Sequence, residues 1–338
     1  MRRKHPPTCR SGMVLIVVLL VLSVIAALVL EFHHDSRLKF QLVANTRAAH
    51  QALHCAEGGL AIAMAALEQN RNIWAEGGLA EIFSGAQQVP VGQGYCTISV
   101  AAESGRINVN ELIDSKGQPV QPQIERMLRL IDLLNARNRD GDRLSYGLVP
   151  AIIDWIDPDD EVTVLPFIQG RNAGAESDYY QGLEKPYKCK NAPLEVLGEL
   201  MLVKGITKDI LHGPLDPEKT GPPVGLEQFL TVHGRGRLNI NDASIIMLET
   251  LSEQIDRTTA ERIVRHRPYT NMNELAEVPG MTPAVLRAIR DHTAIRAGDE
   301  YYTVTTCGTV GQSSRVLRVL VRRNRTGSRI VPVIRWER

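Results

Sequence analysis

Acidic side chains crowd one short stretch of this 338-residue chain. Calcium prefers about six to eight oxygen ligands, and a glycine-containing loop bounded by acids can fold back to supply them. A solvated acidic loop with Asp157-Pro158 in a turn explains the same residues. The spacing does not match an EF-hand, so the residues alone leave both interpretations open. The acids are Asp154, Asp157, Asp159, Asp160, Glu161, Glu176 and Asp178, with Gly170 and Gly174 in the loop between them.

The residue patterns of common catalytic sites are missing from the sequence. It contains no Gly-x-Ser-x-Gly, no His-Glu-x-x-His, no phosphate-binding loop and no Cys-x-x-Cys. His50 and His54 share a helix face and would suit a metal pair, but the sequence places no acidic or cysteine ligand beside them. Packing or solvent-facing roles explain both histidines better. We therefore predict that the protein is not an enzyme.

The N-terminal region contains a long uncharged segment. From Met13 to Leu30 only Ser23 is polar, and as a helix this run would extend roughly 27 Å, close to the hydrocarbon thickness of a bilayer. A cleaved secretory signal has a shorter apolar region followed by small residues. The basic residues before it predict a single membrane span with a cytoplasmic N-terminus and an exported body. These residues are Arg2, Arg3, Lys4 and Arg10.

The helical pattern continues beyond the apolar run. Residues 31–57 contain no proline or glycine, and apolar residues recur there and up to residue 67 at spacings of 3, 4 and 7. We therefore predict one helix from 13 to about 70, with a second half that packs on a domain. The apolar positions are Leu38, Leu42, Ala49, Leu53, Ala56, Leu60, Met64 and Leu67.

The rest of the chain separates into strand-rich and helix-rich parts. Strands are expected near 94–110, a largely helical region extends to about 297, and alternating segments close the chain. The closing strands can complete the sheet that begins before the helical region. The predicted fold class is therefore α+β, with an inserted α-helical domain.

Two segments repeat the pattern Gly-Arg-apolar-Asn-apolar-Asn. They are "GRINVNEL" (105–112) and "GRLNINDAS" (236–244), and each reads as a short strand that runs into a helical segment. Asn241 or Asp242 is a plausible N-cap for a helix that continues through His266. We interpret the repeats as two similar strand-to-helix turns without chemistry.

The N-terminal features together resemble a type IV pilin or pseudopilin. A short basic leader ends at Gly12, an uncharged span follows, and the helix becomes amphipathic. The resemblance implies cleavage between Gly12 and Met13 by a prepilin peptidase and methylation of Met13. Pilins and most pseudopilins have glutamate at the fifth mature position, which is Val17 here. Its absence is similar to the K-type minor pseudopilin of type II secretion.

Several internal segments also resemble the K-type family. They are the two repeated motifs, "AIIDWIDPDDE" (151–161), "AESDYY" (175–180) and "KPYKCKNAPLEVLGELMLVKGIT" (185–207). The resemblance implies a long N-terminal helix packed on an antiparallel sheet, with a large inserted all-α domain. The implied boundaries are a leader at 1–12, a membrane part at 13–30, helix and first strands at 31–110, the insertion at 111–297 and closing strands at 298–338.

The family resemblance implies a function in assembly. It implies a minor pseudopilin at the tip of the type II secretion pseudopilus, in the bacterial inner membrane with a periplasmic body, for protein export across the outer membrane. The implied partners are I-type and J-type minor pseudopilins and other pseudopilus subunits. The family also binds calcium in its helical insertion, which favours the metal interpretation of the acids. The expected ligands are Asp154, Asp157, Asp159, Glu176 and Asp178.

Two segments suggest a different function. "LMLVKGIT" (200–207) and "LAEVPGMTPAVLRAI" (275–289) have the pattern of helix-hairpin-helix turns, which bind phosphate in nucleic-acid-binding proteins. An exported DNA-binding or competence-type component is therefore one alternative, and an uncleaved periplasmic adaptor is another. The net charge of +1 gives little support for DNA binding, and no nucleic-acid partner is expected.

The cysteines agree with an exported protein. Cys9 would leave with the leader, so four cysteines remain and allow three complete pairings. Cys96 and Cys307 both fall in expected strands of one sheet. We therefore chose this pair as the disulfide hypothesis.

Overall fold

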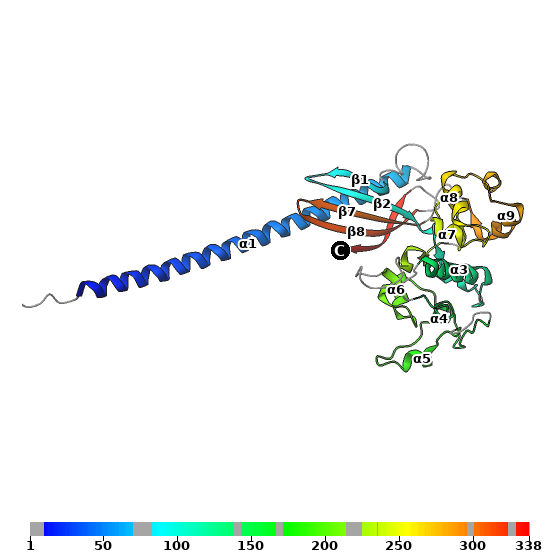
Figure 1. Cartoon of the computed structure of the whole chain (residues 1–338), viewed down its shortest axis with the longest axis horizontal. Helices are drawn as coiled ribbons and strands as arrows, with labels where there is room; N and C mark the ends of the chain where they lie inside the picture. The colour runs from blue at the N-terminus through cyan, green and yellow to red at the C-terminus, as the bar shows by residue number, and fades with distance from the viewer. Residues whose placement is uncertain are drawn as a thin grey trace, which may run out of the picture.

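A computed structural model describes residues 10–69, 83–137, 143–166, 172–213, 225–234, 236–295, 301–323 and 329–337. The helix α1 (Arg10–Gln69) is a single 60-residue helix that extends far out of the body (Figure 1). In its N-terminal half, the apolar residues from Met13 to Leu30 are exposed. This part of α1 is long and apolar enough to cross a membrane. The expected leader lies mostly outside the described residues.

The C-terminal half of α1 packs on a five-stranded antiparallel sheet. The sheet order is β1-β2-β7-β8-β9, so the strands after the insertion complete the sheet that begins before it. The insertion therefore interrupts the sheet in sequence but not in space, as predicted. The strands are β1 (Ser84–Val91), β2 (Gly94–Ala102), β7 (Tyr301–Val310), β8 (Ser313–Arg323) and β9 (Ile330–Glu337).

The contact between α1 and the sheet is unusually close. Gly308 on β7 lies directly under the helix, and a Cβ atom there would overlap the carbonyl oxygen of Ala52. The hydroxyl of Thr306 donates to the carbonyl oxygen of Ala56 at 2.9 Å. Apolar side chains from both layers form one buried core around these contacts, including Leu67, Ile98 and Val304.

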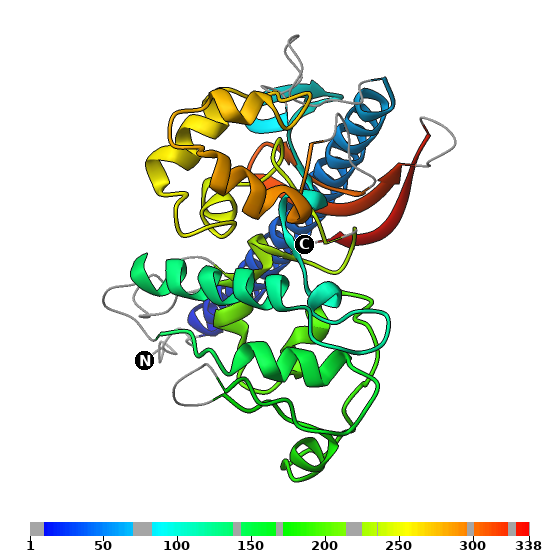
Figure 2. The same cartoon turned by 90° about the vertical axis from the view of Figure 1, so that its right-hand side faces the viewer.

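The insertion contains short helices and the segments between them, arranged in two lobes, a first at 107–231 and a second at 238–294 (Figure 2). Its buried side chains form a second hydrophobic core, separate from the core beneath α1. The α-helices are α3 (Gln121–Arg137), α4 (Leu148–Ile156), α5 (Ser177–Gln181), α6 (Lys208–His212), α7 (Ile245–Glu249), α8 (Arg257–Arg265) and α9 (Pro283–Ile289). The 3-10 helices are η1 (Glu103–Gly105), η2 (Val109–Leu112), η3 (Leu197–Leu202), η4 (Leu226–Gln228), η5 (Glu274–Glu277) and η6 (Arg290–His292).

The repeated sequence motifs occupy equivalent places in the two lobes. β3 (Ile107–Asn108) pairs in parallel with β4 (Leu230–Thr231), and β5 (Leu238–Asn239) pairs in parallel with β6 (Thr293–Ala294). Each of these short sheets joins the beginning of its lobe to its end. The two motifs therefore begin equivalent short sheets, although the sequence had indicated only two similar strand-to-helix turns.

Two local expectations differ from the structure. β3 does not belong to the main sheet, which the chain leaves at Ala102. The helix expected from Asn241 through His266 is divided into α7 and α8, because Ser244 caps α7 and Asp256 caps α8. Asn241 serves instead in the turn before α7, where its backbone N–H donates to the side chain of Asn239.

The strand register separates the cysteines that we expected to pair. Cys96 lies opposite Gly308, whereas Cys307 lies opposite Thr97. Residues one position apart on adjacent strands point to opposite faces of a sheet. Cys96 is buried towards α1, and Cys307 points to the other face; both are free thiols. The expected disulfide is therefore wrong, because the choice of strands was right but their register was unknown.

Candidate functional site

The acid cluster lies at the C-terminal end of α4 in the first lobe. All nine residues of α4 are buried, so the helix places Asp154 inside the lobe and ends at Asp157. The chain then forms an exposed turn and returns beside α4 through an isolated bridge between Val164 and Ala173. The returning segment carries Glu176, immediately before α5.

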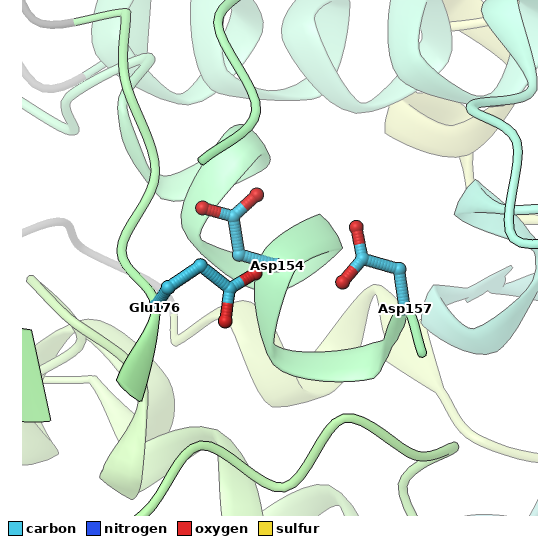
Figure 3. Close-up of side chains that lie close together, drawn as sticks. All are labelled: Asp154, Asp157 and Glu176. Carbon is cyan, nitrogen blue, oxygen red and sulfur yellow. The ribbon is translucent and has the colours of Figure 1, made fainter. Parts of the chain in front are cut away.

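Three carboxylates converge at this point (Figure 3). Asp154, Asp157 and Glu176 each offer one oxygen, and these oxygens lie within 4.8 Å of one another. The three residues are 0%, 4% and 3% exposed. Acids are almost never fully buried unless they are paired with a cation or a hydrogen-bond donor. The cluster therefore requires a physical explanation.

Hydrogen bonds within the described residues satisfy only part of this cluster. One oxygen of Asp154 accepts from the backbone N–H of Thr163 at 2.9 Å. Its other oxygen, Oδ1 of Asp157 and both oxygens of Glu176 receive no hydrogen bond from a nitrogen or oxygen atom of these residues. The thiol of Cys189, a weak donor, lies beside Glu176. Four buried oxygens of the cluster thus lack adequate donors among the described residues.

The electrostatic environment disfavours three negative charges. Burial, with the neighbouring acids as the second cause, raises the pKa of Asp157 to about 7 and that of Glu176 to about 8. Burial also raises the pKa of Asp154. The cluster is at the C-terminus of α4, where the helix dipole is negative and favours cations. A bound cation would relieve all of these effects together.

The residues present fit a hard cation. Carboxylate oxygens are the ligands that calcium prefers, and Asn191 adds a buried amide oxygen that has no partner among the described residues. The Asn191 amide nitrogen donates to the carbonyl oxygen of Asp159 and to Asp160, which fixes the side chain beside the acid loop. The thiol of Cys189 lies nearby, and burial raises its pKa to about 12, which disfavours the thiolate that a softer metal would require.

The structure brings together three of the five expected ligands. Asp159 is exposed, and its carboxylate accepts from the backbone N–H of Glu161. Asp178 is exposed on α5 and lies outside the cluster. Both residues had been chosen by proximity in sequence. Proximity alone does not predict which side of a loop or helix a carboxylate occupies.

Two features of the site were missed in the sequence. Gly174 lies so close to Asp154 that a Cβ atom would overlap its carboxylate, which explains the Gly174-Ala175-Glu176 sequence in the returning segment. Asn191 has a positive φ of 46°, a conformation that favours asparagine among non-glycine residues. Its position in "KCKNAP", ahead of a proline, was a turn signal that could have drawn attention to it.

The two expected hairpin turns are both present. Gly205 (φ 83°) lies between η3 and α6, and Gly280 (φ 103°) lies between η5 and α9. The hydroxyls of Thr207 and Thr282 then cap the second helix of each hairpin. The helices that follow these turns have only five and seven residues, and both pack into the lobes.

Comparisons with known proteins agree with this architecture. Residues 105–213 match the family described as "Type II secretion system (T2SS), protein K", and residues 234–293 match a helix-hairpin-helix motif. The first match covers the lobe with the acid cluster, and the second covers the other lobe.

Two relatives are named "Type II secretion system protein K". The one from Aeromonas hydrophila is 25% identical over 94% of this chain and 95% of its own length. The one from Pseudomonas aeruginosa is 28% identical over 76% of this chain and 72% of its own length. A crystal structure of the GspK-GspI-GspJ complex from enterotoxigenic Escherichia coli contains a similar chain, with a TM-score of 0.59 and 16% identity. That match covers 90% of this chain and 99% of the other.

The long helix, the sheet divided by an insertion and this structural neighbour define a pilin-like protein with an inserted helical domain. The predicted fold is therefore confirmed. With the family match and the two relatives, the comparisons also confirm the resemblance drawn from the sequence. The chain is thus similar to the protein K family of type II secretion systems, in the matched residues 105–213 and along most of its length in the two relatives.

Proposed function

We propose that this chain is the minor pseudopilin at the tip of a type II secretion pseudopilus, where it takes part in pseudopilus assembly and protein export. The observation that carries this proposal is the position of the insertion. It lies at the end of the body remote from the exposed half of α1 (Figure 1). A subunit of this shape can join a helical filament through α1, but its insertion obstructs the place of a further subunit above it.

The exposed half of α1 supports a membrane location before assembly. Its apolar residues are exposed and suit either lipid or the helices of neighbouring subunits. We propose a single pass through the inner membrane, with a cytoplasmic N-terminus and a periplasmic body. The basic residues before the span support this orientation.

The proposed partners are I-type and J-type minor pseudopilins. The solved structure that this chain resembles is a complex of GspK with GspI and GspJ. Exposed apolar side chains continue beyond the membrane-length segment, at Phe32, Leu38, Phe40 and Leu42. They extend the surface that can pack against partner helices outside the lipid.

The N-terminus provides the first test. We propose that prepilin peptidase cleaves between Gly12 and Met13 and that Met13 is then methylated. N-terminal sequencing and intact mass of the membrane-extracted protein, from cells with and without the peptidase, would reveal this. A methylated Met13 found only with the peptidase is the expected result. An intact Met1 in both strains would contradict the proposal and favour an uncleaved adaptor.

We further propose that Asp154, Asp157 and Glu176 hold calcium, with Asp159 and Asp178 in the surrounding acidic loop. When bound, the ion would neutralise the carboxylates and join the end of α4 to the segment before α5. The proposed role is structural. Neither the family nor the described residues give a reason to assign catalysis.

Calcium titration of the full chain in detergent, followed by calorimetry, tests this role. Asp157→Asn should weaken binding by at least roughly ten-fold, because it removes a charged ligand. Asp178→Asn is the matched control, since it removes an exposed acid from the same segment, and it should change affinity less than about three-fold. Equal losses in both variants would show that the loop attracts calcium only through its overall charge.

The DNA-binding alternative has weaker support. The second hairpin matches a helix-hairpin-helix motif, but Glu274, Glu277 and Asp291 accompany its arginines. Arg262 donates to the carbonyl oxygen of Pro279 at 3.2 Å and so has a partner within the hairpin. A surface of mixed charge gives little counterion release on binding DNA.

A further inference from the structure

The junction between the sheet and the insertion contains a buried carboxylate. The chain leaves β2 at Ala102, and the next residue, Glu103, begins η1 and is 3% exposed. It stands between the two hydrophobic cores, which share no buried side chains. Among the described residues, buried apolar packing is therefore not continuous between the insertion and the sheet. Contacts at the junction contribute to their relative orientation.

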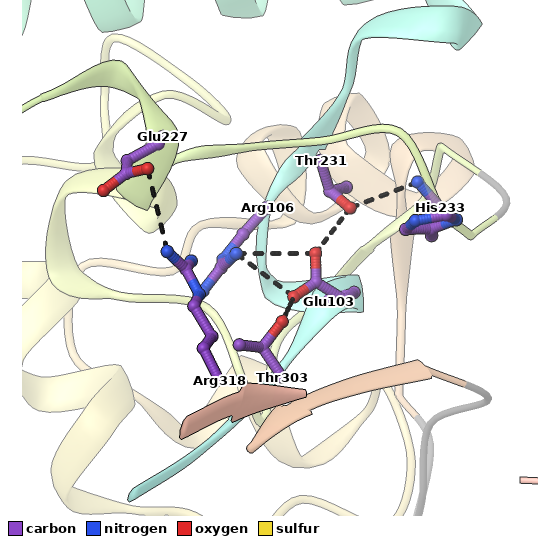
Figure 4. A network of polar contacts seen from close by, with 7 residues as sticks. All are labelled: Glu103, Arg106, Glu227, Thr231, His233, Thr303 and Arg318. Atoms are coloured by element: carbon purple, nitrogen blue, oxygen red, sulfur yellow. Dashed lines mark hydrogen bonds and ion pairs between the residues drawn. The ribbon is translucent and has the colours of Figure 1, made fainter. Parts of the chain in front are cut away.

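Glu103 binds donors from three separate segments (Figure 4). Thr303 on β7 donates its hydroxyl to Oε1 at 2.6 Å, and Thr231 on β4 donates its hydroxyl to Oε2 at 2.5 Å. Arg106 contributes Nη1 at 3.1 and 3.4 Å from the two oxygens. One carboxylate thus joins a strand of the sheet, the return segment of the first lobe and the outgoing chain.

Contacts around Glu103 connect the same parts. The ring of His233 stacks on Tyr301 of β7, with centroids 5.1 Å apart and planes 19° apart. At Gly105, a Cβ atom would lie 2.6 Å from the carbonyl oxygen of Asp242, so this backbone meets the second lobe directly. Beyond these contacts the two parts are separated by a groove of about 560 Å³. Buried polar contact between the two parts is thus concentrated at Glu103 among the described residues.

We propose that Glu103 is a positioning residue that locks the angle between the insertion and the sheet. Hydrogen bonds to a charged acceptor are directional and stronger than neutral ones, and burial makes them costly to break. The insertion then moves with the sheet as one rigid body. Its direction relative to α1 is determined within the subunit and does not depend on partners. This inference does not rest on the proposed function.

The distance between the two parts tests the proposal. Nitroxide labels on unnatural amino acids at Gln312, in the β7–β8 turn, and Glu253, in the second lobe, report it by pulsed electron resonance. Both positions are exposed. The full chain in detergent should give one narrow distance distribution. In Glu103→Gln the amide group opposes one of the donors, and the distribution should become at least roughly two-fold wider.

The matched control is Glu227→Gln. Glu227 also connects the insertion to the sheet, at 3.7 Å from Arg318 on β8, but its side chain is 26% exposed. A partly hydrated pair of this kind contributes little, so the width should remain unchanged. An unchanged width in folded Glu103→Gln, or equal widening in both variants, would overturn the proposal.

A second pair of variants decides the question if Glu103→Gln does not fold. Thr303→Val keeps the shape of the side chain and removes one donor, whereas Thr303→Ser keeps the hydroxyl. The proposal requires a wider distribution in Thr303→Val and the wild-type width in Thr303→Ser. A narrow distribution in Thr303→Val would overturn it.

Discussion

The two lobes of the insertion share one arrangement of elements, which we call the frame, but differ in the helices and segments added to it. Each begins with the repeated motif, closes with a two-stranded parallel sheet and contains one hairpin with a glycine turn. The second lobe adds α7 and α8. The first adds α3, α4, α5 and the long segments around them, which contain the acid cluster.

The hydrogen bonding of polar side chains also differs between the frame that both lobes share and the acid cluster that the first lobe adds. Asn110 exchanges hydrogen bonds with the backbone of Leu194, and Asn241 does the same with Tyr269. These amide groups meet their partners within each lobe. The acid cluster leaves buried oxygens without adequate donors among the described residues. The calcium ion that we propose would supply the interactions that these oxygens lack.

The largest expected effect comes from breaking the frame in either lobe. Asn110→Ala and Asn241→Ala each remove both hydrogen bonds to one backbone residue and leave backbone groups unpaired. Each should lower the free energy of unfolding by about 2–4 kcal/mol, measured by urea denaturation. Asn241→Ala should lower the free energy of unfolding more than Asn110→Ala, because Asn241 is buried, whereas Asn110 is half-buried. Asn273→Ala, at an exposed position, should change stability by less than about 0.5 kcal/mol. Small effects in both variants would show that these hydrogen bonds do not stabilise the frame, and a large effect in only one would contradict the equivalence of the lobes.

The sequence showed the repeated motif of this frame but not the hydrogen bonds that stabilise it. The repeated Asn-apolar-Asn motif was visible, and short strands followed by helices were predicted correctly. What each asparagine binds was not visible, because Leu194 is 84 residues from Asn110. The hairpins were easier to predict, since glycine and threonine at fixed spacing act locally. Local signals were thus sufficient for turns, but long-range partners required the folded chain.

The acid cluster shows the same limit. Asp154 and Asp157 were predicted as ligands from their density, and the structure places them beside Glu176, whereas Asp159 and Asp178 point elsewhere. Nothing in the sequence distinguished the five expected ligands from one another. Burial separates them, and burial depends on how α4 packs. The error in the cysteine pair has the same origin, because a shift of one residue in strand register reverses the face of a side chain.

The second-largest expected effect is stabilisation by calcium, which should differ between the two lobes. Calcium at 100 times its dissociation constant should stabilise the folded chain by about 2.7 kcal/mol. Hydrogen exchange should show the added protection around α4 and α5 and little change in α7 and α8. Magnesium prefers a smaller octahedral site, so it should protect less at the same concentration. Uniform protection of both lobes would contradict a site confined to the first.

The pH dependence without calcium follows from the raised pKa values. Folding raises the pKa of Asp157 from 3.8 to about 7 and that of Glu176 from 4.5 to about 8. The folded state therefore holds protons that the unfolded state releases. This contribution to stability is complete below about pH 4 and is lost as the pH rises towards 8.

In chelator, we expect the free energy of unfolding to fall by on the order of 1 kcal/mol between pH 5 and pH 8. The fall is this small because water entering the loop relieves part of the repulsion between the carboxylates. Thermal unfolding at several pH values measures it. Saturating calcium should remove the loss, since the ion replaces the protons. Asp157→Asn should flatten the chelator curve. A profile that is the same in the wild type and this variant would show that other groups control it.

The smallest effect tests the two hairpins against each other. Thr207 and Thr282 each accept a hydrogen bond at 3.3 Å from a backbone N–H in the following helix. Thr207→Ala and Thr282→Ala should each lower the free energy of unfolding by about 1 kcal/mol, and the serine variants should recover most of this loss.

The response to calcium should distinguish the two alanine variants. The first hairpin contacts the acid-bearing segment, where the Lys204 ammonium donates to the carbonyl oxygen of Gly174 at 2.9 Å. Calcium should therefore slow hydrogen exchange around α6 in Thr207→Ala and leave α9 in Thr282→Ala unaffected. The same response in both would mean that the lobes are coupled through the frame that they share.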